Sequence, residues 1–136
     1  MKRLFFILLL LTLYPQPARA QVLIASWYSV DSLKAEGTYK YSKGVMSNGK
    51  LFKDEAFTCA TRDFKLGETL KITSVTSGKS VICKVTDRIS KRFKGKRIDL
   101  SKGSFNKIAD CKQGIVKVTV EVVRWVNSGC QRKNMN

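Results

Sequence analysis

Few side chains in this sequence could carry acid–base chemistry. The 136 residues include ten Asp or Glu, 26 Lys or Arg, and no His. Without histidine the chain can form neither a Ser-His-Asp triad nor a metal site that depends on imidazole. Any acid–base catalysis therefore depends on a carboxyl group, which can donate a proton and later take one back.

Asp87 is the first carboxyl candidate because of its position. It follows the alternating segment 80–86 and is the single acid between Lys84 and Arg97, a stretch with seven Lys or Arg. Asp87 could act as an acid and base, or it could pair with Arg88 or cap a turn. Cationic neighbours lower the pKa of a carboxyl group, whereas a general acid needs a raised pKa. The residues alone leave both roles open.

Asp99 is the second candidate. It lies between Ile98 and Leu100 in a short strand, so its side chain points away from theirs. It could line a cleft beside Asp87. The more common role for an Asp just before Ser101, a predicted helix N-cap, is to stabilise the start of the helix, and we favour that role.

Aromatic and basic residues provide candidate binding groups. Trp27 and Tyr28 are consecutive in a predicted strand, so one could pack while the other stacks on a ligand, or both could belong to the core or its rim. Lys91 and Arg92 belong to the basic run 91–97. This run is either a solvated loop or a surface that holds an anionic polymer.

The first 20 residues have the pattern of a secretory signal peptide. Lys2 and Arg3 precede a short apolar run, and Ala18-Arg19-Ala20 forms a cleavage site. We expect cleavage before Gln21 and export to the periplasm, the cell envelope or the medium, with no membrane-spanning segment after cleavage. An uncleaved anchor is the alternative. No cysteine stands at the cleavage site, so a lipid anchor is not indicated.

Charge and cysteine content suggest the surroundings of the exported chain. A net charge of +16 would normally suggest nucleic acid, but export favours anionic envelope polymers instead. The even number of cysteines predicts up to two disulfides with open pairing, and buried free thiols are the alternative. Their spacing contains no Cys-x-x-Cys pair, so we expect no metal and no cofactor. The cysteines are Cys59, Cys83, Cys111 and Cys130.

Periodicity predicts a mainly β fold with one short helix. Residues 29–48 are polar and are expected to form a long loop. Residues 102–110 have helical spacing of apolar side chains after Ser101. Several short strands in one chain of this size indicate a small closed barrel, which would form a single domain over residues 21–136. The predicted strands are residues 22–28, 70–73, 80–86, 98–100 and 116–122.

A set of short motifs carries a family resemblance. In order along the chain they are Ala25-Ser26-Trp27-Tyr28, Asn48-Gly49 with Phe52, Thr58, Leu66-Gly67, Gly78 with Ser80-Val81, Asp87-Arg88, and Ile98-Asp99-Leu100-Ser101 before the helix. Together they resemble the rare lipoprotein A family, which is related in fold to expansins and barwin-like proteins. The match covers about residues 25–123. It implies a six-stranded double-psi β-barrel that acts on the glycan strands of peptidoglycan.

The resemblance also implies an activity. Enzymatic members are lytic transglycosylases that cleave glycan strands stripped of peptides and leave 1,6-anhydro ends, without a metal or cofactor. The matching positions make Asp87 the acid/base, with Asn48 and Arg88 as binding residues beside those named above.

Several positions depart from the family pattern. Lys50 and Lys53 replace acids, Thr61 replaces a His, and Ile89 replaces a loop glycine. Asp54 or Glu55 could substitute for a lost acid. The alternative is a glycan-binding envelope protein that has lost catalysis.

Overall fold

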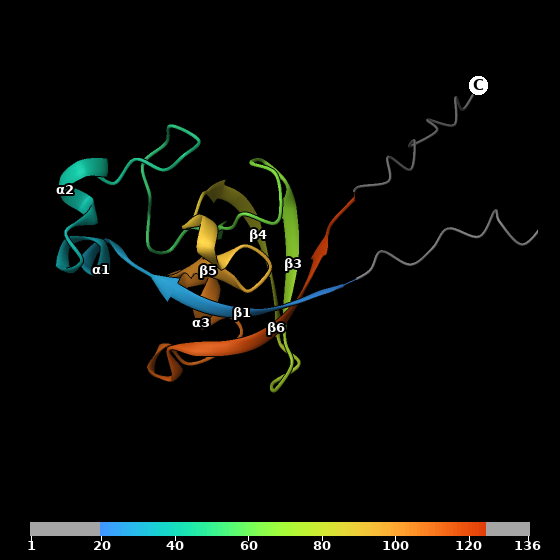
Figure 1. Cartoon of the computed structure of the whole chain (residues 1–136). Coiled ribbons are helices and arrows are strands. Elements are labelled where there is room, and N and C mark those ends of the chain that lie inside the picture. Colours follow the sequence, from blue (N-terminus) through green and yellow to red (C-terminus); the bar gives the residue numbers. More distant parts are fainter. Residues whose placement is uncertain (1–19, 125–136) are drawn as a thin grey trace, which may run out of the picture.

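The structure is a computed structural model that describes residues 20–124, and six strands of this segment close into a barrel (Figure 1). Around the barrel the strands follow the order β1-β5-β2-β4-β3-β6. The predicted closed six-stranded barrel is therefore confirmed. The strands are β1 (Gln21–Tyr28), β2 (Thr58–Ala60), β3 (Thr69–Ser74), β4 (Ser80–Asp87), β5 (Arg97–Ser101) and β6 (Ile115–Val122).

Two of the strand pairs are parallel. β1 runs parallel to β5, and β2 runs parallel to β4, while the other four neighbouring pairs are antiparallel. Parallel neighbours need crossover connections rather than tight hairpins. Because β2 is antiparallel to β5, β4 runs opposite to β1 and β5, and the last residue of β4, Asp87, pairs with Ala60 of β2, which pairs in turn with Asp99 of β5.

Alternating side chains fill the barrel as the sequence predicts. In β4 the inward face carries Val81, Cys83 and Val85, while Ile82 and Lys84 are exposed. The valines of β6 face inward in the same way, and Phe105 next to the barrel is fully buried. Burial of this apolar surface stabilises the fold by about 25 cal/mol per Å².

Two predictions about helices are wrong. The segment 29–48 is not simply a loop, because it contains helices α1 (Val30–Ala35) and α2 (Thr38–Ser42). Neither helix buries a residue, so neither has the apolar periodicity by which a helix is recognised. The predicted helix 102–110 is shorter, since α3 spans Lys102–Asn106.

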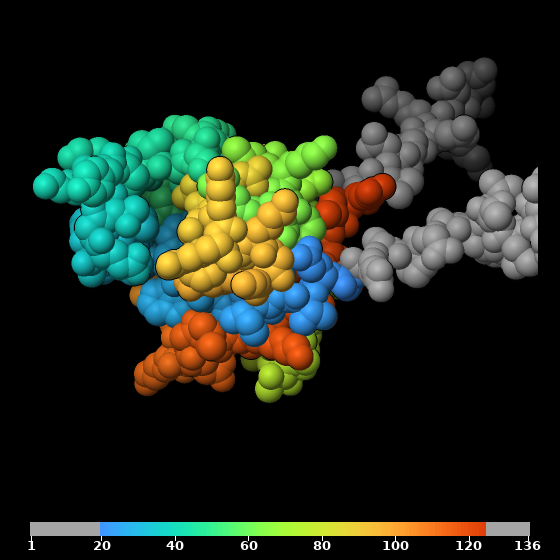
Figure 2. Space-filling model, viewed as in Figure 1, coloured from blue at the N-terminus to red at the C-terminus, as the bar shows by residue number. Residues whose placement is uncertain are grey.

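Local hydrogen bonds explain why α1 forms without a buried face. The Ser29 hydroxyl accepts from the backbone N–H of Ser32, and the Ser32 hydroxyl accepts from that of Ser29. This reciprocal capping satisfies two otherwise unpaired donors. The Asp54 carboxylate accepts a further hydrogen bond from the N–H of Val30. In Figure 2, α1 and α2 form a lobe beside the barrel.

The expectation that disulfides cross-link the barrel is not confirmed. Cys59, Cys83 and Cys111 carry free thiols, and Cys130 lies outside the described residues. Cys59 and Cys83 are buried on neighbouring strands of the core, and the neighbouring Cys83 thiol, together with burial, raises the pKa of Cys59.

The predicted signal peptide also lies outside the described residues, apart from Ala20. Within residues 20–124 no helix is long and apolar enough to span a membrane. The same segment contains no cluster of three potential metal-ligating Cys, Asp or Glu side chains.

Candidate functional site

A β-bulge at the end of β4 positions Asp87. The register between β2 and β4 shifts there, since Cys59 pairs with Val85 and Ala60 with Asp87. Thr86 is the extra residue, and it is buried where alternation would place it outside. A bulge re-aims the side chain that follows it. Asp87 is thereby removed from the inward face, and it is half-buried in the lining of a cleft.

A cleft of about 450 Å³ lies beside Asp87. Its lining comes from the last residues of β1 and β4, from the first half of β5, from the segment after β4, and from the α1–α2 lobe. Six predicted site residues line it together. They are Trp27, Tyr28, Asp87, Arg88, Arg92 and Asp99.

Asp87 is held by three hydrogen bonds to one carboxylate oxygen. Its Oδ1 accepts from the Ser47 backbone N–H at 3.0 Å, the Ser47 hydroxyl at 2.7 Å and the Arg88 N–H at 2.8 Å. Oδ2 has no hydrogen-bond donor within residues 20–124. The side chain of Arg88 does not pair with Asp87, because its Nη1 donates to the carbonyls of Thr61 and Phe64.

Asp99 does not stabilise the start of α3, so the role that the sequence favoured is wrong. Its Oδ1 accepts from the Ser26 hydroxyl and from Nε of Arg97 at 2.6 Å. The start of α3 is capped instead by the Ser101 hydroxyl, which accepts from the N–H of Ser104. Asp99 thus lies in the cleft as one half of an ion pair.

Tyr28 places a buried hydroxyl at the cleft. Its ring stacks on Phe52 with centroids 4.4 Å apart, and its hydroxyl has no hydrogen-bond partner in the described part of the chain. Burial, followed by the charge of Asp87, raises the pKa of Tyr28. A buried hydroxyl without a partner costs free energy unless a ligand supplies one. Trp27 is anchored differently, since its indole N–H donates to the carbonyl of Cys111 at 2.9 Å.

Phe93 and Glu36 are two of the cleft residues that no sequence pattern indicated. Phe93 has Arg92 and Arg97 over its ring, with guanidinium carbons 4.7 and 4.9 Å from the centroid. Glu36 brings a third carboxyl group to the cleft from the C-terminal end of α1. Phe93 was hidden within a run of charges. Glu36 had no signal, because α1 itself was not predicted.

Four predicted site residues lie outside the lining of this cleft. Asn48 donates its N–H to Thr86 and accepts from Lys50, which shapes the turn that carries Ser47. Asp54 holds the start of α1, and the backbone of Glu55 lies against Gly103.

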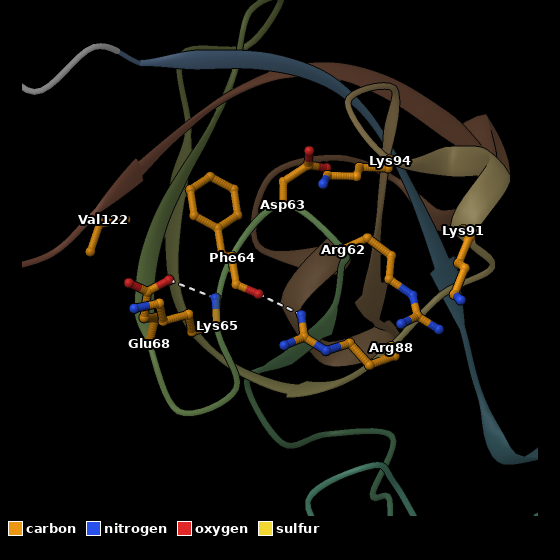
Figure 3. A pocket seen from close by; sticks show the side chains of 9 residues that line it. All are labelled: Arg62, Asp63, Phe64, Lys65, Glu68, Arg88, Lys91, Lys94 and Val122. Carbon is orange, nitrogen blue, oxygen red and sulfur yellow. Dashed lines mark hydrogen bonds between the residues drawn. The ribbon is translucent and has the colours of Figure 1, made fainter.

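Lys91, the fourth, lines a separate pocket of about 620 Å³, called here the basic pocket (Figure 3). Its residues are Arg62, Asp63, Phe64, Lys65, Glu68, Arg88, Lys91, Lys94 and Val122.

The positions that depart from the family pattern can now be placed. Lys50 and Lys53 are exposed, whereas Thr61 is fully buried with its hydroxyl accepting from the N–H of Asp63. Ile89 is buried as well. Lys50 and Lys53 stand where the family pattern has acids, and neither lysine lines the cleft.

A double-psi barrel with a carboxylate at a bulged strand end defines the class of this protein. The chain belongs to the lytic transglycolase family, whose model matches residues 20–120. This confirms the family resemblance of the motifs.

Two relatives illustrate the match. The chain is 32% identical over 124 residues to the endolytic peptidoglycan transglycosylase RlpA of Pseudomonas aeruginosa, covering 89% of this chain and 33% of that protein. It is 31% identical over 102 residues to the probable endolytic peptidoglycan transglycosylase RlpA of Synechocystis, covering 74% of this chain and 28% of that protein. The chain thus spans about a third of the length of these curated relatives.

Solved structures share the fold. The Streptomyces papain inhibitor superposes with a TM-score of 0.59 at 18% identity, covering 81% of this chain and all of that one. An expansin of Clavibacter michiganensis superposes with a TM-score of 0.56 at 20% identity, covering 78% of this chain and 51% of that one. The predicted likeness to the expansin fold is confirmed.

Proposed function

We propose that this protein is a lytic transglycosylase that cleaves peptidoglycan glycan strands stripped of peptides and leaves 1,6-anhydro ends. The observation that carries the proposal is the cleft in which Asp87 has one oxygen fixed by protein donors and the other oxygen open. The names of the relatives, which specify endolytic peptidoglycan transglycosylases, support the choice of substrate.

Asp87 would perform both proton transfers. Protonated at Oδ2, it gives its proton to the glycosidic oxygen as the bond to C1 of the muramyl sugar breaks. The C6 hydroxyl of the same sugar then bonds to C1 and returns its proton to the Asp87 carboxylate. The reaction consumes no water and regenerates the carboxyl group, so one acid suffices.

The other residues of the cleft would bind and orient the strand. Tyr28, whose hydroxyl is buried, can offer the accessible part of its side chain to a sugar ring at the wall of the cleft. Trp27 and Phe93 can pack against sugar rings. Arg92 and the Asp99–Arg97 pair would bind hydroxyl or carboxylate substituents.

We also propose that the chain acts outside the cytoplasm, in the periplasm or cell envelope, as one domain that begins at Gln21 after signal-peptide cleavage. Without Lys2, Arg3 and Arg19, the net charge of +16 for the full sequence becomes +13, which would keep the protein near anionic envelope polymers.

The test is a digest of denuded glycan strands by the purified protein, with products identified by mass. Anhydro ends that accumulate with time, and that disappear with the Asp87→Asn variant, would support the proposal. Strands that bind without yielding anhydro ends would overturn it.

Binding without anhydro ends is what a competing proposal predicts. In that proposal the chain binds glycan but does not cleave it. The specific observation in its favour is the replacement of family acids by the exposed Lys50 and Lys53. Under this proposal the cleft retains its affinity for glycan, and the Asp87→Asn variant binds as well as the wild type.

A further inference from the structure

The basic pocket has a composition that the proposed glycan cleavage does not require. Five of its nine residues are Lys or Arg, and two are acidic. Residues 20–124 contain one salt bridge, Arg97–Asp99, and it does not involve this pocket. The positive charge of the pocket is therefore not neutralised by its own carboxylates.

Both carboxylates are engaged by backbone donors instead. The two oxygens of Asp63 accept from the N–H of Gly95 at 2.8 and 3.0 Å, and Glu68 accepts from the N–H of Lys65 at 2.8 Å. These bonds hold the loops that form the pocket. They leave the cationic side chains available to a ligand.

Two guanidinium groups are fixed in place at the pocket wall. Nε of Arg62 donates to the carbonyl of Ile89 at 2.6 Å, and Nη1 of Arg88 donates to the carbonyls of Thr61 and Phe64. Both side chains are half-buried. Each retains N–H groups that these bonds do not use, so a pre-organised pair of donors faces the pocket. Figure 3 shows both groups among the lining residues, together with Lys91 and the ring of Phe64.

We propose that the basic pocket binds the phosphate group of a phosphorylated sugar. A phosphate presents several anionic oxygens, which match two planar guanidinium groups and the nearby ammonium of Lys91. The lining also includes Phe64 and Val122, whose apolar surfaces suit the body of a sugar ring. Arg88 lines both this pocket and the cleft, so a phosphate-bearing glycan could contact the two sites at once.

Calorimetry with glucose 6-phosphate tests this inference directly. We expect binding that weakens with added salt, and no detectable binding of glucose at the same concentration. Glucuronate, which carries a carboxylate, should bind more weakly than glucose 6-phosphate. Equal heats for the phosphate and the uncharged sugar would overturn the proposal.

Variants locate the site. Lys91→Ser/Lys94→Ser removes two exposed charges of the pocket and should weaken glucose 6-phosphate binding about tenfold. Arg62→Gln should weaken it as well, while circular dichroism reports whether the fold is intact. The matched control, Lys71→Ser/Lys112→Ser, removes two exposed charges elsewhere and should bind like the wild type. Equal loss in the control would show that net charge, not the pocket, attracts the phosphate.

A lipid surface is the other source of the same chemistry. Vesicles that contain phosphatidic acid serve as the second arm, with neutral vesicles as their control. Retention on the acidic vesicles without binding of glucose 6-phosphate would overturn the sugar assignment. Because none of these measurements involves glycan cleavage, their failure is distinct from failure of the proposed enzyme activity.

Discussion

At the scale of single residues, the two central carboxylates of the cleft have different partners. Asp99 is committed to Ser26 and to the ion pair with Arg97. Asp87 accepts three hydrogen bonds from neutral donors at Oδ1. A carboxylate in an ion pair is a poor proton donor, because protonation would break the pair. Asp87 is therefore the better acid/base of the two, and each can be tested by a single substitution.

Replacing Asp87 by Asn should abolish catalysis while keeping the fold. The Asn Oδ1 can still accept the hydrogen bonds from Ser47 and Arg88, but the amide cannot cycle a proton. We expect anhydro product to fall by about a hundredfold or more, the usual scale for loss of a general acid. Product yield per folded molecule is the measurement.

The control is Asp110→Asn, an exposed acid outside the cleft lining, which should retain full activity. Undiminished cleavage by Asp87→Asn would assign the chemistry to one of the other carboxyl groups of the cleft, Glu36 or Asp99.

Replacing Tyr28 by Phe should separate stability from binding. The variant loses a buried hydroxyl that has no partner in the described segment, so its free energy of unfolding at neutral pH should stay equal or rise by up to about 1 kcal/mol. Its affinity for glycan should stay unchanged, because the ring remains and the buried hydroxyl does not reach the surface of the cleft. Chemical denaturation and glycan binding measure the two effects. A loss of affinity would show that the hydroxyl becomes accessible and contacts the glycan.

The pH dependence of the same variant provides an independent check. The pKa of Tyr28 is raised in the folded state above its ordinary value of 10.0. As the pH rises past 10, the unfolded chain loses this proton first, so the wild type loses stability. The loss between pH 9 and 11 should be smaller in Tyr28→Phe. Identical losses would mean that the phenol ionises as easily in the folded protein as in the unfolded one.

At the scale of elements, close contacts between segments hold the cleft together. The turn 46–50 supplies Ser47 to Asp87, and Asp54 joins the start of α1 to the loop before β2. That loop is packed directly on α3, because the N–H of Gly103 donates to the carbonyl of Asp54 at 2.8 Å. A Cβ at position 103 would lie 2.9 Å from backbone atoms of Glu55. No sequence pattern predicts these contacts, because they join segments that are distant along the chain.

Replacing Gly103 by Ala should therefore destabilise the protein, although alanine ordinarily favours a helix. The added methyl group meets backbone atoms that cannot rotate away, so we expect a loss of about 1–3 kcal/mol in the free energy of unfolding. The control is Asn106→Ala at an exposed position of the same helix, which loses an exposed hydrogen bond from the Cys111 thiol and should stay within about 0.5 kcal/mol of wild type. A stabilised Gly103→Ala variant would mean that α3 and the loop can separate without cost.

At the scale of the whole molecule, alternation of apolar residues made the barrel predictable. The valines of β6 and the inward face of β4 are readable because a strand has a period of two. The three-residue β2 has too few residues to display a period, and α1 and α2 bury nothing. The same limit applies to the cleft. Asp87 could be selected by motif, but the bulge that aims it depends on pairing with β2, which the sequence does not encode locally.

A closed barrel should also protect its core cysteines from solvent until the whole molecule opens. Cys59 and Cys83 are buried within the barrel, whereas Cys111 is half-exposed on the short helix after α3. A thiol reagent should label Cys111 at once, and it should label Cys59 and Cys83 at least about a thousandfold more slowly, through global unfolding. Mass spectrometry of single-cysteine peptides over time measures the rates.

The control is the same reaction in denaturant, where all three thiols should react alike. If Cys59 and Cys83 stay unlabelled in denaturant until a reductant is added, the two are joined by a disulfide in the isolated protein. If they react as fast as Cys111 under native conditions, the barrel opens locally beside β2 rather than as one unit.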